Sequence, residues 1–134
     1  MIRWTGLLAV LLVVAACGDG QADTTAQTAA VGDPERGRQI WEDGGDVLSG
    51  PCSNCHSLDG SEEPGESRRA PTFQGISERA GDRVPGLSAE EYLRESIVDP
   101  AAYIVEGYLG IMQSYKFLLS EEDIDNLIAF ILTQ

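Results

Sequence analysis

A chain of 134 residues is long enough for one domain of ordinary size and too short for two. Hydrophobic residues make up 43% of the chain and charged residues 23%, which is typical of a globular protein and argues against general disorder. Nine lysine and arginine residues against 22 acidic residues give a net charge of −13 at pH 7, and a chain this acidic repels phosphate backbones, so we expect no nucleic-acid partner.

The amino-terminal segment has the layout of an export signal followed by a tether. Arg3 precedes the apolar run GLLAVLLVVAA, whose roughly 10 residues fall short of the ~20 that a membrane-spanning helix needs. The residues before Cys17 resemble the lipobox of bacterial lipoproteins, in which the cysteine is acylated and becomes the first residue. This resemblance implies a signal peptide at 1–16, a lipidated Cys17 with a flexible tether at 17–31, and export to a membrane surface facing the periplasm or the cell exterior. The alternative is a plain signal peptide cut near Ala16.

Residues 32–134 are predicted to form one helical domain, because no alternating strand pattern runs for more than a few residues. Asp33 can cap free backbone donors and Pro34 suits the first helical position, so a first helix is predicted to run from Pro34 to Glu42. The polar segment 59–75, which contains two prolines, is predicted to be a long surface loop.

Two further helices are predicted in the carboxyl-terminal half. Ser88 begins one, and Asp99 ends it because a residue before proline avoids helical geometry. The segment 103–117 contains two glycines and is predicted to be mostly loop. Ser120 and Asp123 form a capping pair for a last helix that runs to the chain end. Its apolar residues recur at helical spacing: Ile124, Leu127, Ile128 and Ile131.

The stretch CSNCH carries the chemistry of this chain. Zinc fails on ligand count, because only Cys17 could add to Cys52, Cys55 and His56. A redox dithiol lacks its strand-helix-strand context, and a simple disulfide remains possible but leaves His56 unexplained. Covalent haem attachment uses all three residues, since each thiol can add to a haem vinyl group and the imidazole can ligate the iron. The predicted cofactor is therefore one covalent haem c.

The second axial ligand is predicted to be Met112. The chain has no second histidine, and Met1 leaves with the signal. Met112 lies 56 residues beyond His56 in a glycine-bearing segment that can curl over a flat ligand. The alternatives are water, no ligand or Lys116, and an average methionine is simply a core filler.

With these motifs, the domain resembles class I cytochromes c, which implies a small all-α fold of three to five helices around one haem. GDPERGRQIW resembles the family's first helix, in which Gly37 and Trp41 match a glycine and an aromatic residue that pack against the last helix. Leu127 and Phe130 match their partners there.

The resemblance extends to both sides of the iron. In RRAPTFQGI, Pro71 matches the proline whose carbonyl accepts a hydrogen bond from the proximal histidine, here His56. ESIVDPAAYIVEGYLGIMQSY resembles the segment that leads to the distal methionine, and Met112 matches that ligand. Gln113 replaces the proline that commonly follows it, which is expected to loosen the loop.

These features predict a membrane-tethered one-electron carrier. A haem with both axial positions filled has no open site for a substrate, so we expect neither enzyme activity nor a small-molecule substrate. The expected partners are redox proteins, namely a quinol-oxidising complex and a terminal oxidase or reductase. Two alternatives remain open: a haem-based gas sensor in which Met112 is displaceable, and a haem subunit of a larger oxidoreductase.

Overall fold

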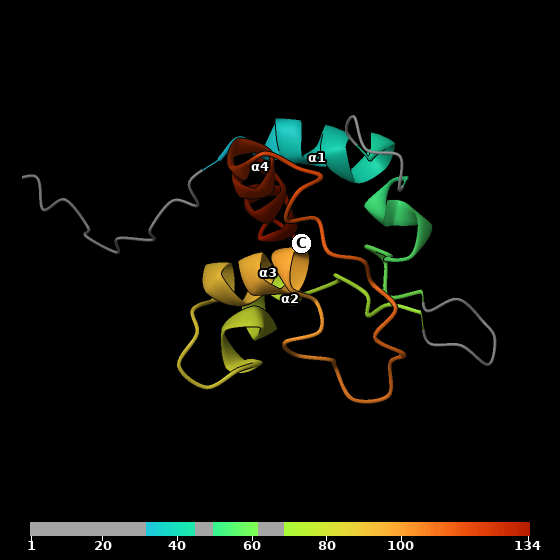
Figure 1. Cartoon of the computed structure of the whole chain (residues 1–134), viewed down its shortest axis with the longest axis vertical. Coiled ribbons are helices and arrows are strands. Elements are labelled where there is room, and N and C mark those ends of the chain that lie inside the picture. Colours follow the sequence, from blue (N-terminus) through green and yellow to red (C-terminus); the bar gives the residue numbers. More distant parts are fainter. Residues whose placement is uncertain (1–31, 45–49, 62–68) are drawn as a thin grey trace, which may run out of the picture.

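Helices and loops alone build the part of the chain that the computed structural model describes, which is residues 32–44, 50–61 and 69–134 (Figure 1). These ranges contain no strand, so the all-α prediction is confirmed. The predictions for residues 1–31, including the lipidated Cys17, concern a segment outside the described residues.

Six helical elements follow one another within the described ranges. Sequence periodicity predicted three of them and missed α2 and η2, because elements of four and three residues are too short to show a helical repeat. In chain order the elements are α1 (Pro34–Asp43), η1 (Cys52–Asn54), α2 (Ile76–Arg79), η2 (Ala80–Asp82), α3 (Ala89–Val98) and α4 (Glu121–Ile131).

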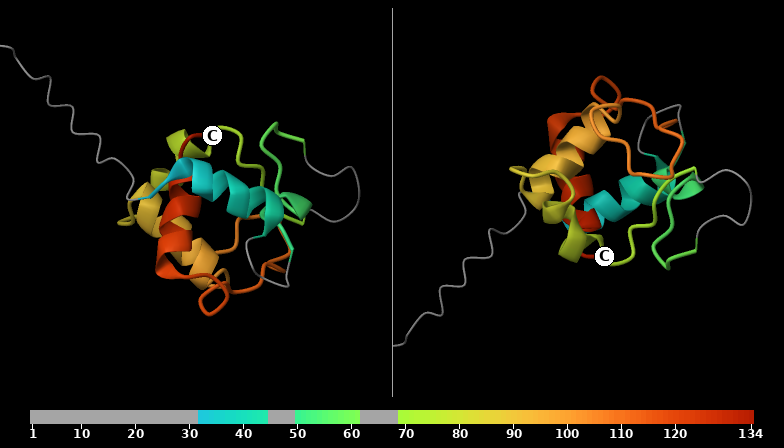
Figure 2. Two further views of the ribbon diagram at one scale, coloured as in Figure 1. Left: turned by 90° about the horizontal axis from the view of Figure 1, so that it is seen from above. Right: turned by 90° about the horizontal axis from the view of Figure 1, so that it is seen from below.

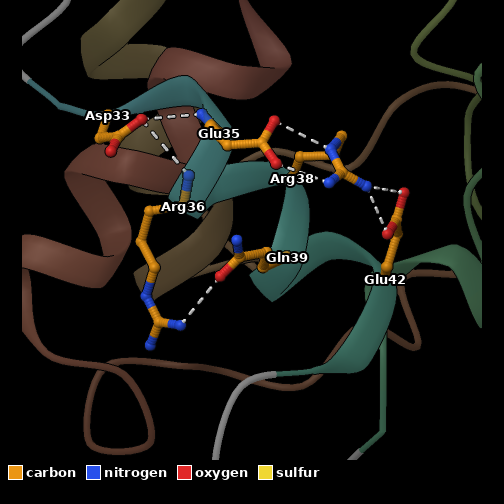
Figure 3. Close-up of polar contacts among 6 residues, drawn as sticks. All are labelled: Asp33, Glu35, Arg36, Arg38, Gln39 and Glu42. Carbon is orange, nitrogen blue, oxygen red and sulfur yellow. Dashed lines mark hydrogen bonds and ion pairs between the residues drawn. The ribbon is translucent and has the colours of Figure 1, made fainter.

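The caps of α1 explain where this helix begins and ends. The Asp33 carboxylate accepts hydrogen bonds from the backbone N–H groups of Glu35 (2.9 Å) and Arg36 (3.4 Å), as Figure 3 shows. At the other end, Gly44 has a φ of 80°, and its N–H donates to the carbonyl oxygen of Ile40 at 2.8 Å. Helix α1 thus has the predicted start and ends one residue later than predicted.

An ion-pair network covers the exposed face of α1. The Arg38 guanidinium contacts the carboxylates of Glu35 and Glu42, each at 2.6 Å (Figure 3). The pKa of Glu35 lies below its usual value because Arg38 donates a hydrogen bond to the carboxylate. These groups face water, so the network contributes little to stability and mainly marks the solvent side of the helix.

Helices α3 and α4 begin with the predicted side-chain caps. Ser88 accepts a hydrogen bond from the Glu91 N–H at 3.2 Å, and the Glu91 carboxylate accepts one from the Ser88 N–H at 2.8 Å. Ser120 accepts from the Asp123 N–H at 3.1 Å. Helix α4 was predicted to reach the chain end but stops at Ile131, because the last residues form tighter turns with bonds to the residue three positions back.

The closest packing of the fold is the crossing of α1 over α4, which Figure 2 shows from two sides. A Cβ atom at Gly37 would lie 1.9 Å from the backbone oxygen of Asn126 and 2.8 Å from the Cβ of Phe130. One helix turn further, the rings of Trp41 and Phe130 are 5.9 Å apart. The predicted contact between the first and last helices is confirmed.

A buried asparagine fastens the start of the domain to α4. Asn126 is 6% exposed, and its side-chain oxygen accepts a hydrogen bond of 2.7 Å from the backbone N–H of Asp33. The sequence pattern of α4 gave no sign of this role, because an asparagine within an apolar face has no periodic signature.

The apolar core joins these two helices to α2 and α3. It contains Ile40 and Trp41 of α1, Ile76 of α2, and buried residues of α3 and α4: Tyr92, Leu93, Ile97, Ile124, Leu127, Ile128, Phe130 and Ile131. The long segment between α3 and α4 has no helix, as predicted, and passes along one side of this core (Figure 1). Within the described ranges, no helix combines the length and apolar character needed to cross a membrane.

Candidate functional site

The CSNCH stretch folds into a single tight turn. In η1, the backbone N–H groups of Cys55 and His56 both donate to the carbonyl oxygen of Cys52, at 3.1 and 3.0 Å. Both thiols are free; Cys52 is half-buried and Cys55 is exposed. Burial raises the pKa of the Cys52 thiol to about 11, and proximity to Cys55 acts in the same direction. The turn therefore presents two free thiols next to one imidazole.

The His56 ring is held in one orientation. Its Nδ1 donates a hydrogen bond to the carbonyl oxygen of Pro71 at 2.8 Å, the contact that the family resemblance implies. The ring stacks on Phe73 at 4.6 Å between centroids with an interplanar angle of 18°, and Trp41 lies at 6.2 Å. Burial lowers the pKa of His56, opposed by the bond to Pro71, so the imidazole is held neutral with Nε2 available as a ligand.

Two sets of hydrogen bonds hold the Pro71 segment against His56. The Phe73 N–H and the Thr72 hydroxyl both donate to the carbonyl oxygen of Ser57, at 2.8 and 3.1 Å. From α2, the Arg79 guanidinium donates to the carbonyl oxygens of Thr72 and Gln74. Burial, and secondarily the nearby charge of Arg83, lower the pKa of Arg79. Arg79 thus braces the loop that orients the imidazole.

A pocket opens in front of His56, with about 790 Å³ of open space including its mouth. Apolar and aromatic side chains from α3, α4 and the segment between them dominate its walls, and Met112 lies in the lining together with His56 and Pro71. Its apolar lining includes Phe73, Ile76, Tyr92, Leu93, Ile97, Tyr103, Ile104, Val105, Ile111 and Ile131.

The loop that carries Met112 is fastened just after the methionine. The Tyr115 N–H donates to the carbonyl oxygen of Ile97 at 3.0 Å, and the Ser114 hydroxyl donates to that of Val98 at 2.5 Å. Both acceptors belong to the last turn of α3, which is part of the core. Met112 itself is 36% exposed and also belongs to the pocket lining, so the residue is accessible to solvent as well as to the pocket.

The groups around this pocket suit a haem with two thioether links. Cys52 and Cys55 supply the thiols, His56 supplies a neutral nitrogen donor, and Met112 supplies a soft sulfur donor. The walls are apolar, as a porphyrin face requires. Among the described residues, no cluster of three or more His, Cys, Asp and Glu offers a competing metal site.

The family model for cytochrome c matches residues 34–134. This chain belongs to the cytochrome c family. No curated protein matches the chain. As a cytochrome c of class I type, it binds haem c covalently, and the pair Cys52 and Cys55 fits that attachment. It is an electron-transfer protein of a family whose members are generally not enzymes and are typically exported.

The structure brings the predicted site residues of this cytochrome c to one region. His56, Pro71 and Met112 line the pocket, and Cys52 and Cys55 lie beside it in the turn before His56. The sequence reasoning missed the stacking ring of Phe73, the brace of Arg79, and two further arginines in the lining, Arg69 and Arg83. A signal was available for the arginines: four of them fall between residues 68 and 83 of a strongly acidic chain.

Proposed function

We propose that this cytochrome c is a membrane-tethered one-electron carrier, with His56 and Met112 as the axial ligands of its single haem c. The observation that carries the proposal is that both side chains line the same apolar pocket, although 56 residues separate them in sequence. When bound, haem c supplies a one-electron couple between ferrous and ferric iron. The chain supplies the ligands, the orientation and the low-dielectric surroundings.

Each wall of the pocket has a part in setting the potential. The carbonyl oxygen of Pro71 accepts a hydrogen bond from Nδ1 of His56, which increases the donor strength of Nε2. A methionine sulfur favours ferrous iron and raises the potential relative to a second histidine. The apolar lining excludes water and disfavours the additional charge of ferric iron, which acts in the same direction. If His56 and Met112 both held the iron, no position would be left for a substrate.

The tether would determine how often the domain meets its partners, and its surface would determine how it docks on them. Acylation at Cys17 would hold the domain near redox partners in the membrane and raise their effective concentration. A quinol-oxidising complex as donor and a terminal oxidase or reductase as acceptor suit such a carrier. The surface carries one lysine, Lys116. The segment between α3 and α4 exposes apolar side chains, including Ile104, Leu109 and Ile111. Docking is therefore expected to be weak, transient and mostly apolar.

Spectroscopy with a matched pair of loop variants tests the ligand assignment. The oxidised wild-type protein should show the charge-transfer band of methionine-ligated ferric haem and should not bind carbon monoxide readily when reduced. Met112→Ala should lose the band and gain carbon monoxide binding. Leu109→Ala is the control, because Leu109 belongs to the same exposed loop but does not line the pocket. An unchanged spectrum in Met112→Ala would refute the assignment.

A second candidate function is gas binding by a haem whose Met112 ligand is displaced. Two features favour it: Met112 is partly exposed, and Gln113 stands where the family commonly has proline. Ready binding of carbon monoxide by the reduced wild-type protein would select this function over electron transfer. The anchor has its own test, because Cys17→Ser should release the protein from membranes, and retention would refute lipidation.

A further inference from the structure

We propose that the turn at residues 116–118 is a membrane contact, which places Phe117 and Leu118 among the lipid headgroups and so orients the domain on the bilayer. The inference rests on the lipid anchor of the proposed function. It goes beyond that anchor, because a flexible tether holds a domain near a membrane without fixing which side of the domain faces the lipid.

The exposed apolar surface of the described residues gathers in the segment between α3 and α4. Every large hydrophobic side chain that is exposed there belongs to this segment: Tyr103, Ile104, Leu109, Ile111, Met112, Phe117 and Leu118. Four of them line the pocket in front of His56, where a bound haem would cover them. Phe117 and Leu118 do not line it, and Phe117 is 90% exposed. An apolar pair that the cofactor does not cover indicates another contact surface.

The turn that carries this pair is held in place from the core side. The N–H groups of Leu118 and Leu119 both donate to the carbonyl oxygen of Tyr115, at 2.9 and 3.1 Å. Tyr115 and Leu119 pack against the core, and the Tyr115 N–H donates to the carbonyl oxygen of Ile97 at 3.0 Å. The turn thus presents Phe117 to solvent on an ordered backbone, so contact with a bilayer would cost little further ordering of the chain.

The charge at the turn suits a lipid headgroup. Lys116 is the single lysine of a chain with a net charge of −13, and its Nζ lies 5.6 Å from the centroid of the Phe117 ring. At a membrane surface, a lysine ammonium pairs with headgroup phosphates while its stem and a neighbouring aromatic ring enter the apolar boundary. Lys116 and Phe117 have this arrangement.

Ion pairs neutralise most of the acidic charge that follows the turn in α4. Glu121 contacts Arg94 at 2.9 Å, and Asp125 contacts the same guanidinium. Asp123 lies 3.7 Å from the Arg36 guanidinium. Each pair cancels charge locally, so this region repels anionic headgroups less than a run of unpaired carboxylates would.

The start of the domain lies close to the turn along α4. In Figure 1 the described chain begins beside α4, where the Asp33 N–H donates to the Asn126 side chain at 2.7 Å. The turn leads into the same helix, whose N-cap is Ser120. From Ser120 to Asn126 the helix rises by about 9 Å. The proposed tether of residues 18–31 has a root-mean-square length of about 20 Å, so a bilayer that holds Cys17 is within reach of the turn.

The haem itself can report the orientation of the domain. The haem-loaded, lipidated protein is placed in oriented, hydrated stacks of bilayers made from phosphatidylcholine and phosphatidylglycerol. Electron paramagnetic resonance of the ferric haem is then recorded as the stack is rotated in the magnetic field. A domain fixed on the bilayer gives signals that depend on the angle, whereas a domain that only hangs from its tether gives signals that do not.

Three variants locate the contact. We expect the wild-type signals to depend on the angle and the double variant Phe117→Ser/Leu118→Ser to lose this dependence. Leu109→Ser is the matched control and should retain it, because Leu109 is an exposed apolar residue of the same segment outside the turn. Lys116→Gln should weaken the dependence more on bilayers with phosphatidylglycerol than on phosphatidylcholine alone.

Three results would overturn the proposal. One is a wild-type protein that stays on the bilayer but gives signals independent of the angle; another is an angle dependence that survives in the double variant. The third is a dimer of Cys17→Ser protein in sedimentation equilibrium that the double variant abolishes, which would assign the turn to a second copy of the chain. Failure of the wild-type protein to stay on the bilayer would instead refute the anchor, and the membrane contact with it.

Discussion

The substitution Gly37→Ala tests the crossing of α1 and α4 most severely. The added Cβ would lie 1.9 Å from the oxygen and 2.6 Å from the carbonyl carbon of Asn126, and both atoms belong to the backbone of α4. Ordinary contacts begin near 3.4 Å, so the two helices would have to separate by about 1.5 Å in a close-packed core. No rotamer change can relieve a clash between a Cβ atom and a backbone.

The expected loss of stability follows from two opposing effects. Overpacking in a core costs about 1–3 kcal/mol, and more where the obstacle is backbone. Replacing glycine by alanine within a helix returns about 0.5–1 kcal/mol through helix propensity. The net loss should be about 2 kcal/mol or more, which for a domain of this size lowers the melting temperature by about 8 °C or more.

Chemical denaturation of the haem-loaded protein, monitored by circular dichroism, measures this effect. Gly81→Ala is the matched control, because a Cβ at Gly81 would have its nearest neighbour at 3.7 Å, the backbone nitrogen of Ala89, and the backbone there needs no positive φ. Its stability should stay within about 0.5 kcal/mol of wild type or increase slightly. Equal stability of Gly37→Ala and Gly81→Ala would refute the reasoning.

Three further substitutions probe the core, the buried amide and a cap. Ile124→Ala empties a fully buried site and should cost about 2–5 kcal/mol in denaturant unfolding; a cost below about 1 kcal/mol would mean that the core closes around the gap. Asn126→Ala leaves the Asp33 N–H without its acceptor and should cost about 1–3 kcal/mol, and no loss would show that water replaces the amide. Bonds from Ser88 lower the pKa of Glu91, so its carboxylate stabilises the fold above its unfolded pKa and ceases to do so as the pH falls through the folded pKa. Glu91→Ala should thus lower the melting temperature at about pH 7 and much less at about pH 2, whereas an equal effect at both pH values would contradict a charge-dependent cap.

Much of the fold could be predicted because its signals are local. The starts of α1, α3 and α4 depend on Asp33, Ser88 and Ser120, whose side chains cap donors within three residues. The short α2 could not be predicted, because its four residues are held by tertiary contacts of Ile76 in the core rather than by periodicity.

In the candidate site, too, the local features could be predicted from the sequence and the long-range contacts could not. The spacing of Cys52, Cys55 and His56 forms a local motif, and the absence of other soft ligands directed attention to Met112. The role of Arg79 could not be predicted, because it depends on which loop its side chain meets across space. Contacts between side chains that are distant in sequence are determined by packing, and no pattern in a single sequence predicts them.

The most direct test of the central claim is the absorption spectrum of the oxidised wild-type protein, recorded with its magnetic resonance spectrum after reduction. If His56 and Met112 ligate the iron from opposite sides of the pocket, the oxidised form shows the charge-transfer band of methionine-ligated haem, and the reduced form shows strongly shifted methionine methyl protons. Absence of both signals in a protein with covalently attached haem would contradict the claim.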